Sequence, residues 1–110
     1  MQSALPKLQR RLNEVNAIDP TQATDPRAPE FEAINENVNA TLMEIFGVDS
    51  ADYERYKSSR LYAGTFYVDG TPKHEVIEGY QDGKKRVLVK LDAAIKFINL
   101  LTKNLQKTNY

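Results

Sequence analysis

Mostly apolar residues in the last third of the chain recur at alternating steps of three and four. The series is Ile77, Tyr80, Lys84, Val87, Leu91, Ala94, Ile98, Leu101 and Leu105. This is the heptad period, which keeps one seam of a helix facing a partner. It predicts a helix from about Pro72 to Gln106, roughly 50 Å long. Such a rod in a chain of 110 residues is more typical of a scaffold or interaction module than of an enzyme.

The first segment also has helical periodicity. Its apolar stripe consists of Leu5, Leu8, Leu12 and Val15, with charged residues between them. This spacing predicts an amphipathic helix from about Ser3 to Ala17. Asp19 precedes a proline, which pushes its backbone out of the helical region and ends the helix. Residues 19–29 then form a polar linker with three prolines.

A second helix is expected to start near Ala28 and Pro29. Its apolar stripe is Phe31, Ile34, Val38, Leu42 and Ile45. Gly47 is a natural stop, because glycine relieves the left-handed conformation just past a helix end. Asp49 or Ser50 should then cap a short third helix. That helix carries Tyr53, Tyr56 and, if it continues far enough, Tyr62 on one side.

Residues 63–71 read as an irregular or β-like insert. Residues 65–68 have strand-like composition, and Asp69-Gly70 is a turn signal. Thr71-Pro72, by contrast, resembles a helix cap followed by proline at the first helical position. We therefore expect an extended loop here, followed directly by the long helix.

Two glycines interrupt the long helical pattern. Gly79 and Gly83 each cost about 1 kcal/mol relative to alanine inside a helix. They indicate either a kink or break in the rod or a close helix crossing. The sequence leaves these alternatives open.

These elements predict one all-α domain over residues 1–110, in which three shorter helices pack on the long C-terminal helix. The first two helices should form an antiparallel hairpin across the proline linker, lying on the long seam. If the shorter helices do not cover the whole rod, its end should pair with a second copy. This predicts a homodimer with Ile98, Leu101 and Leu105 as the contact.

Composition is ordinary for a soluble globular protein, with 41% hydrophobic and 27% charged residues. No apolar run approaches the roughly 20 residues needed to cross a bilayer. The absence of cysteine excludes disulfides and thiolate metal sites, and it is compatible with the cytoplasmic location we expect. The net charge is zero but unevenly spread. Residues 1–47 carry 4 basic and 7 acidic side chains, whereas residues 48–110 carry 11 and 8.

Candidate catalytic residues are scarce. His74 is the only histidine, and no orienting partner or nucleophile is marked beside it. Six of the 15 acidic residues form two groups at expected helix starts, namely Glu30, Glu32 and Glu36, and Asp49, Asp52 and Glu54. Negative charge is favoured at helix starts by the helix dipole. We therefore predict no enzymatic activity, no cofactor and no metal site.

Two surface features are candidates for binding. The cations Lys84, Lys85, Arg86 and Lys90 could contact an anion such as a nucleotide. The tyrosines Tyr53, Tyr56 and Tyr62 suit a partner interface, because tyrosine offers contact area at low entropic cost. Packing of Tyr53 and Phe66 in the core against the long helix is an equally weighted alternative for this run of aromatic residues.

A resemblance adds to this reading. Asp25-Pro26, Phe31, the run from Leu42 to Gly47, Ser50 and the following tyrosine-rich helix resemble a helical region of bacterial phage-defence proteins. That region precedes predicted nucleotide-binding, TIR-like effector domains. Gly83 and the stripe at 91–101 are similar to the long helix that closes the region. The resemblance would span residues 8–105. It implies a role in regulation or assembly, without enzymatic activity.

The leading functional hypothesis is therefore a non-catalytic protein interaction or oligomerisation module of a regulatory kind, in a bacterial or phage defence-related system. Its partner would be another protein or a second copy. The alternative is a small anion- or nucleotide-binding protein that uses the basic cluster at 84–90. Neither hypothesis involves a membrane.

Overall fold

The computed structural model describes residues 3–23, 26–64 and 70–108, with side chains through residue 104. The helices are α1 (Ala4–Asn16), α2 (Pro29–Phe46), α3 (Ala51–Tyr56) and α4 (Lys73–Thr108), with a 3-10 turn, η1, at Pro20–Gln22. Within these ranges the chain contains no strand. The predicted all-α bundle, with three shorter helices on one long C-terminal helix, is confirmed.

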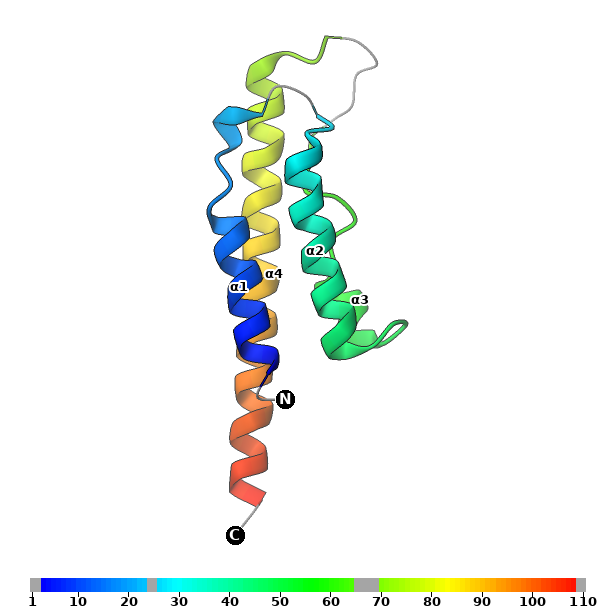
Figure 1. Cartoon of the computed structure of the whole chain (residues 1–110), viewed down its shortest axis with the longest axis vertical. Coiled ribbons are helices and arrows are strands. Elements are labelled where there is room, and N and C mark those ends of the chain that lie inside the picture. Colours follow the sequence, from blue (N-terminus) through cyan, green and yellow to red (C-terminus); the bar gives the residue numbers. More distant parts are fainter. Residues whose placement is uncertain (1–2, 24–25, 65–69, 109–110) are drawn as a thin grey trace.

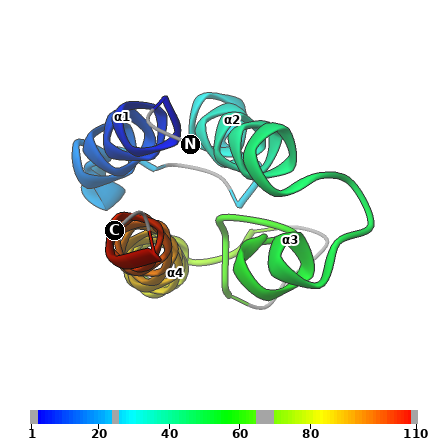
Figure 2. The same ribbon diagram turned by 90° about the horizontal axis from the view of Figure 1, so that it is seen from below.

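The helices occupy four corners of a bundle when viewed along its long axis (Figure 2). α1 and α2 form an antiparallel hairpin, and α1 packs on both α2 and α4 (Figure 1). α3 contacts α2 and α4 from the opposite corner. Because α3 is only 6 residues long, it fills this corner at one end of the bundle only.

The core is an apolar seam shared by the three longer helices. On α4, the heptad positions Tyr80, Val87, Leu91, Ala94 and Ile98 are all buried. α1 contributes Leu8 and Val15, and α2 contributes Val38 and Leu42. Burying one large aliphatic side chain stabilises a fold by about 1.5–3 kcal/mol. The predicted stripes are thus the principal source of cohesion between α1, α2 and α4.

Helix boundaries follow local chemistry. The Ser50 hydroxyl accepts a hydrogen bond from the Tyr53 amide at 3.0 Å and caps α3. Gly47, with φ of +89°, ends α2 in a conformation that favours glycine. Asp19 caps η1 by accepting from the Thr21 amide and hydroxyl, and these bonds lower the pKa of the Asp19 carboxyl.

The chain leaves α3 earlier than the sequence suggested. α3 ends at Tyr56, so Tyr62 lies outside it. Residues 57–64, here called the closing segment, contain no regular helix or strand and lie between α2 and α4. Of the expected insert at 63–71, residues 65–69 lie outside the described part of the structure.

Candidate interaction surfaces

The closing segment is held on α2 by polar side chains. Glu32, Asn35 and Asn39 lie at spacings of three and four along one face of α2. The two Glu32 carboxylate oxygens accept from the amides of Leu61 and Tyr62, at 3.0 and 3.1 Å. These bonds satisfy backbone groups that a regular helix would have paired internally.

Ser58 is held by two asparagines. The Asn39 carboxamide accepts from the Ser58 amide at 3.0 Å and donates to the Ser58 carbonyl. Asn35, which is 2% exposed, donates to the same carbonyl at 3.0 Å. Among the described side chains, the Asn35 Oδ1 is the one buried polar atom without a partner. We did not predict either asparagine as important. The available signal was the presence of poor helix formers inside a long helix.

On α4, two glycines make room for the closing segment. The Gly79 carbonyl accepts from the Ala63 amide at 3.0 Å. A Cβ on Gly83 would lie 1.5 Å from the Leu61 carbonyl oxygen, and a Cβ on Gly79 would lie 2.3 Å from the Tyr62 ring. The break considered from the sequence is absent, because α4 is one helix from Lys73 to Thr108. The two glycines allow the closing segment, rather than another helix, to approach the α4 backbone closely.

Tyr80 joins the two sides of this interface. Its hydroxyl lies 2.9 Å from the Pro26 carbonyl oxygen and 3.2 Å from a Glu32 carboxylate oxygen. Its ring meets Phe31 edge-on, with centroids 5.2 Å apart, and Tyr62 at 5.1 Å. Burial and the Glu32 carboxylate raise the pKa of Tyr80 well above its usual range. The phenol is therefore a neutral structural group at ordinary pH.

The predicted anion patch is not a single patch. Lys84 donates to the Ile18 carbonyl at 2.7 Å, just past the end of α1. Arg86 lies two residues further along α4, a rotation of about 200°. It donates to the Arg60 carbonyl of the closing segment at 2.9 Å. The cluster is contiguous in sequence but divided between two sides of the helix.

Lys90 also serves the fold. Its ammonium donates to the Lys57 carbonyl at 2.6 Å, and burial lowers the pKa of Lys90. Of the four predicted cations, Lys85 is exposed and makes no described contact of this kind. The geometry thus removes the main support for an anion site formed by all four residues.

Part of the predicted partner interface is core. Tyr56 and Tyr62 are buried, and the ring of Tyr56 packs 6.3 Å from that of Phe97. Ile98 has no exposed surface. In the folded chain these three residues therefore offer little surface to a partner, because other parts of the chain cover them. Tyr53 is half-buried, with the Lys57 ammonium 5.7 Å from its ring centre.

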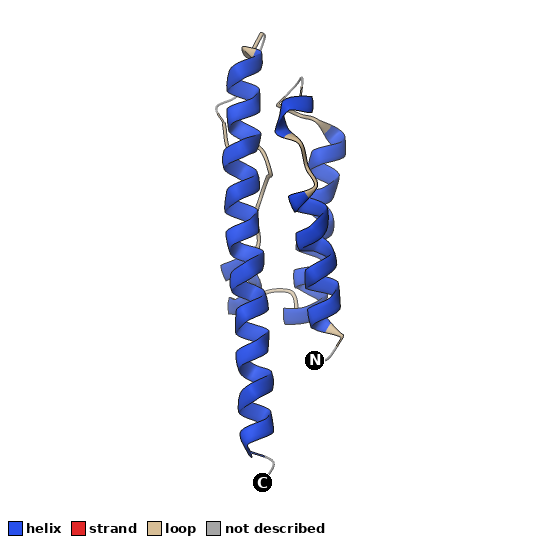
Figure 3. Cartoon of the chain, turned by 90° about the vertical axis from the view of Figure 1, so that its left-hand side faces the viewer, coloured by secondary structure: helices blue, strands red, loops and turns tan. Residues whose placement is uncertain are grey.

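The end of α4 extends beyond the bundle (Figures 1 and 3). Up to residue 104, Ile98 is the last buried residue, and every side chain from 99 to 104 is half-buried or exposed. Leu101, a predicted contact residue, is half-buried. The side chain of Leu105, the other, lies outside the described part. The longest dimension of the molecule is 62 Å.

Large exposed apolar side chains among the described residues are Met43, Val48, Val89 and Leu100. Val89 is 69% exposed and Leu100 is 57% exposed, and both belong to α4. They are eleven residues apart, about three helical turns, which places them on the same face. This face is on the opposite side of α4 from the buried seam.

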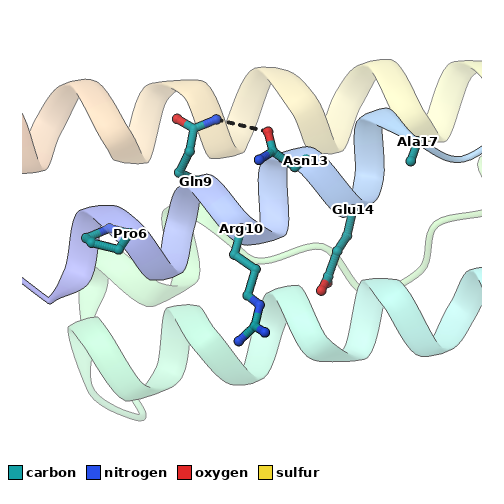
Figure 4. Close-up of a pocket in the computed structure, with 6 residues that line it drawn as sticks. All are labelled: Pro6, Gln9, Arg10, Asn13, Glu14 and Ala17. Atoms are coloured by element: carbon teal, nitrogen blue, oxygen red, sulfur yellow. Dashed lines mark hydrogen bonds between the residues drawn. The ribbon is translucent and has the colours of Figure 1, made fainter.

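One shallow depression lies along α1 (Figure 4). It has a volume of about 600 Å³ and is lined by Pro6, Gln9, Arg10, Asn13, Glu14 and Ala17. All six residues belong to α1 or its C-terminal cap, at helical spacing. Gln9 and Asn13 hydrogen-bond to each other at 3.1 Å. Ligand sites normally enclose a ligand with groups from several elements, so this depression is the outer surface of one helix.

The remaining candidates for catalytic or metal-binding chemistry are the histidine and the acidic side chains of residues 3–23, 26–64 and 70–104. His74 is exposed in the first turn of α4. No group of three or more His, Cys, Asp or Glu side chains in these ranges could hold a metal ion. None of the described helices combines the length and apolarity needed to span a membrane.

A scan against protein-family models, a search of curated proteins and a search of solved structures each found no match to this chain.

Proposed function

We propose that this chain is a non-catalytic protein interaction module whose contact element is the C-terminal end of α4. The proposal rests on one observation, the incomplete burial of the heptad seam of α4 near its C-terminal end. Among the described side chains, Ile98 is the last buried heptad position, whereas the helix continues to Thr108. Leu101, the next heptad position, is left half-buried.

A helix end whose apolar face is only partly packed is poorly stabilised. Isolated helices shorter than about 12–15 residues are marginal in water, and helical stability in proteins comes mainly from packing of an apolar face. Residues 99–104, near the end of α4, have half-buried or exposed side chains. A helix or apolar surface of another protein molecule would continue the seam and stabilise this end.

The resemblance to the helical region of bacterial phage-defence proteins supports the same kind of role. It suggests that the module regulates or assembles an effector, in the cytoplasm, without catalysing a reaction. The alternative of a nucleotide-binding protein has less support, because Lys84, Arg86 and Lys90 donate to backbone carbonyls of the chain itself.

Site-specific cross-linking tests the proposal. The chain has no cysteine, so one introduced cysteine is a unique attachment point. A photoreactive group on Leu101→Cys should capture a protein in extracts of the source cells, whereas the same group on Gln9→Cys, on the outer face of α1, should not. The captured protein is then purified and its complex rebuilt from pure components. Loss of that complex with Leu101→Glu supports the proposal, and equal capture from both positions contradicts it.

A further inference from the structure

The outer face of α4 carries a second heptad-spaced stripe. Val89, Ala93, Lys96 and Leu100 follow one another at steps of four, three and four, and all four are exposed. This spacing keeps side chains on one line along a helix, as in a coiled-coil seam. An apolar residue at each end and a small residue between them leave room for a second helix. The stripe is separate from the seam that holds the bundle together.

We infer that this outer stripe pairs with the same stripe of a second copy, in antiparallel orientation. The inference rests on the proposed function in treating α4 as the contact element, but it uses a different face of the helix. Pairing that sets Val89 opposite Leu100 of the second copy also sets Leu100 opposite Val89. The Val89–Leu100 contact therefore occurs twice in the dimer and covers both exposed apolar residues of each copy. Such repetition is what a two-fold symmetric interface requires.

Charge selects the antiparallel orientation. In the same pairing, Lys96 is level with Ala93 of the second copy, which places it one residue from the level of that copy's Asp92 on the same flank; the symmetric contact brings Asp92 equally close to Lys96 of the second copy. Within one chain these residues already form an exposed ion pair at 2.9 Å, with side chains 55% and 77% exposed. In a parallel pair in register, Lys96 would lie beside Lys96 of the second copy, so like charges would meet. Complementary charges across an interface favour the correct partner orientation, and like charges penalise the wrong one.

One repulsive contact accompanies the pairing. Lys85 and Lys103 lie on the flank of the stripe, and the antiparallel arrangement brings Lys85 of one copy near Lys103 of the other. Both side chains are exposed, so they can turn toward solvent. This pair makes the orientation testable, because reversing the charge at residue 85 should tighten the dimer.

The test measures the molar mass of the full chain by sedimentation equilibrium from about 5 to 500 µM. We expect a concentration-dependent dimer, with a dissociation constant in the micromolar range appropriate to a small interface. Val89→Glu and Leu100→Glu should each yield a monomer with an unchanged melting temperature, since both residues are exposed. Lys85→Glu should lower the dissociation constant about two- to tenfold.

Orientation is measured with a spin label on Lys103→Cys. The antiparallel pair places the two labels about 25–30 Å apart along the helix axes, whereas a parallel pair places them about 10 Å apart. A monomer at 500 µM, or a short label distance, would overturn the inference. A dimer that is broken by Leu101→Glu but not by Val89→Glu would overturn it too. That result would leave the proposed function intact, because the contact would then lie at the end of the seam.

Discussion

The two sides of α4 that face the bundle are covered by different chemistry. On the side of α1, apolar side chains interlock in a continuous seam, with Leu8 and Val15 buried against the heptad positions of α4. On the side of the closing segment, glycines admit the chain, and hydrogen bonds from α2 and α4 hold its backbone. The two sides of α4 should therefore differ in how well they tolerate substitutions. An apolar seam accepts modest changes of volume, whereas the closing segment depends on individual atoms.

This contrast explains how an incomplete four-helix arrangement is closed. α3 ends at Tyr56, and an extended chain takes over the corner that a longer helix would fill. An extended chain has unpaired backbone groups, and burying them without partners is costly. The polar stripe on α2, formed by Glu32, Asn35 and Asn39, supplies those partners.

The largest expected effect comes from Gly83→Ala. Alanine improves helix propensity by about 1 kcal/mol, but its Cβ would overlap the Leu61 carbonyl, which is backbone. We expect a loss of about 4 kcal/mol of unfolding free energy, or failure to fold. Gly79→Ala should cost less, because the obstacle is the side chain of Tyr62. Denaturant unfolding checks the order, with the exposed Gln81→Ala as control. A stabilised Gly83→Ala protein would refute the close approach.

Next in size is the seam on α1. Leu8→Ala should lower the unfolding free energy by about 2–5 kcal/mol, because it leaves a cavity at a position with no exposed surface. The same change at Leu100, which is 57% exposed, should alter it by no more than about 0.5 kcal/mol in the monomer. Urea titrations at low protein concentration measure both. Equal effects at the two positions would mean that α1 does not cover the seam.

A smaller effect is expected from Glu32→Gln. The new amide group would direct a donor at one of two backbone N–H donors, Leu61 or Tyr62. We expect a loss of about 1–3 kcal/mol, and faster hydrogen exchange confined to the closing segment. Glu36→Gln, exposed on the same helix, is the matched control. If both variants behave alike, Glu32 does not hold the segment.

The pH dependence should be weaker still. The pKa of Tyr80 is raised in the folded state, so above about pH 10 the unfolded chain loses this proton first. The contribution of Tyr80 is therefore fully present below pH 10, and it falls as the pH rises further. Stability curves of the natural chain and Tyr80→Phe should converge at alkaline pH. The lowered pKa of Lys90 acts in the opposite direction but is common to both proteins. Parallel curves up to pH 12 would contradict the assignment.

Periodicity predicted the apolar half of this structure and could not predict the polar half. The heptads of α4 and the stripes of α1 and α2 are repeated patterns, so a few substitutions do not obscure them. Local capping preferences also predicted the start of α3 at Ser50 and the end of α2 at Gly47. These features depend on residues close in sequence, which is why they could be read directly.

The closing segment depends on contacts between distant residues. Asn39 is 19 positions from Ser58, and Glu32 is 29 positions from Leu61. Each donor or acceptor is an ordinary polar residue, without spacing that marks its partner. The prediction of a single basic patch failed for the same reason, because the partners of these cations are distant in the sequence. Adjacent cations such as Lys84 and Arg86 look like one patch until the helix rotates them to different sides.

Amide hydrogen exchange within the closing segment is the most direct test of how the bundle is closed. The amides of Ser58, Leu61 and Tyr62 donate to α2 side chains, so they should exchange nearly as slowly as amides inside α1. Exchange at the rate of an unstructured peptide, in a protein whose α4 amides remain protected, would show that the fourth corner is open.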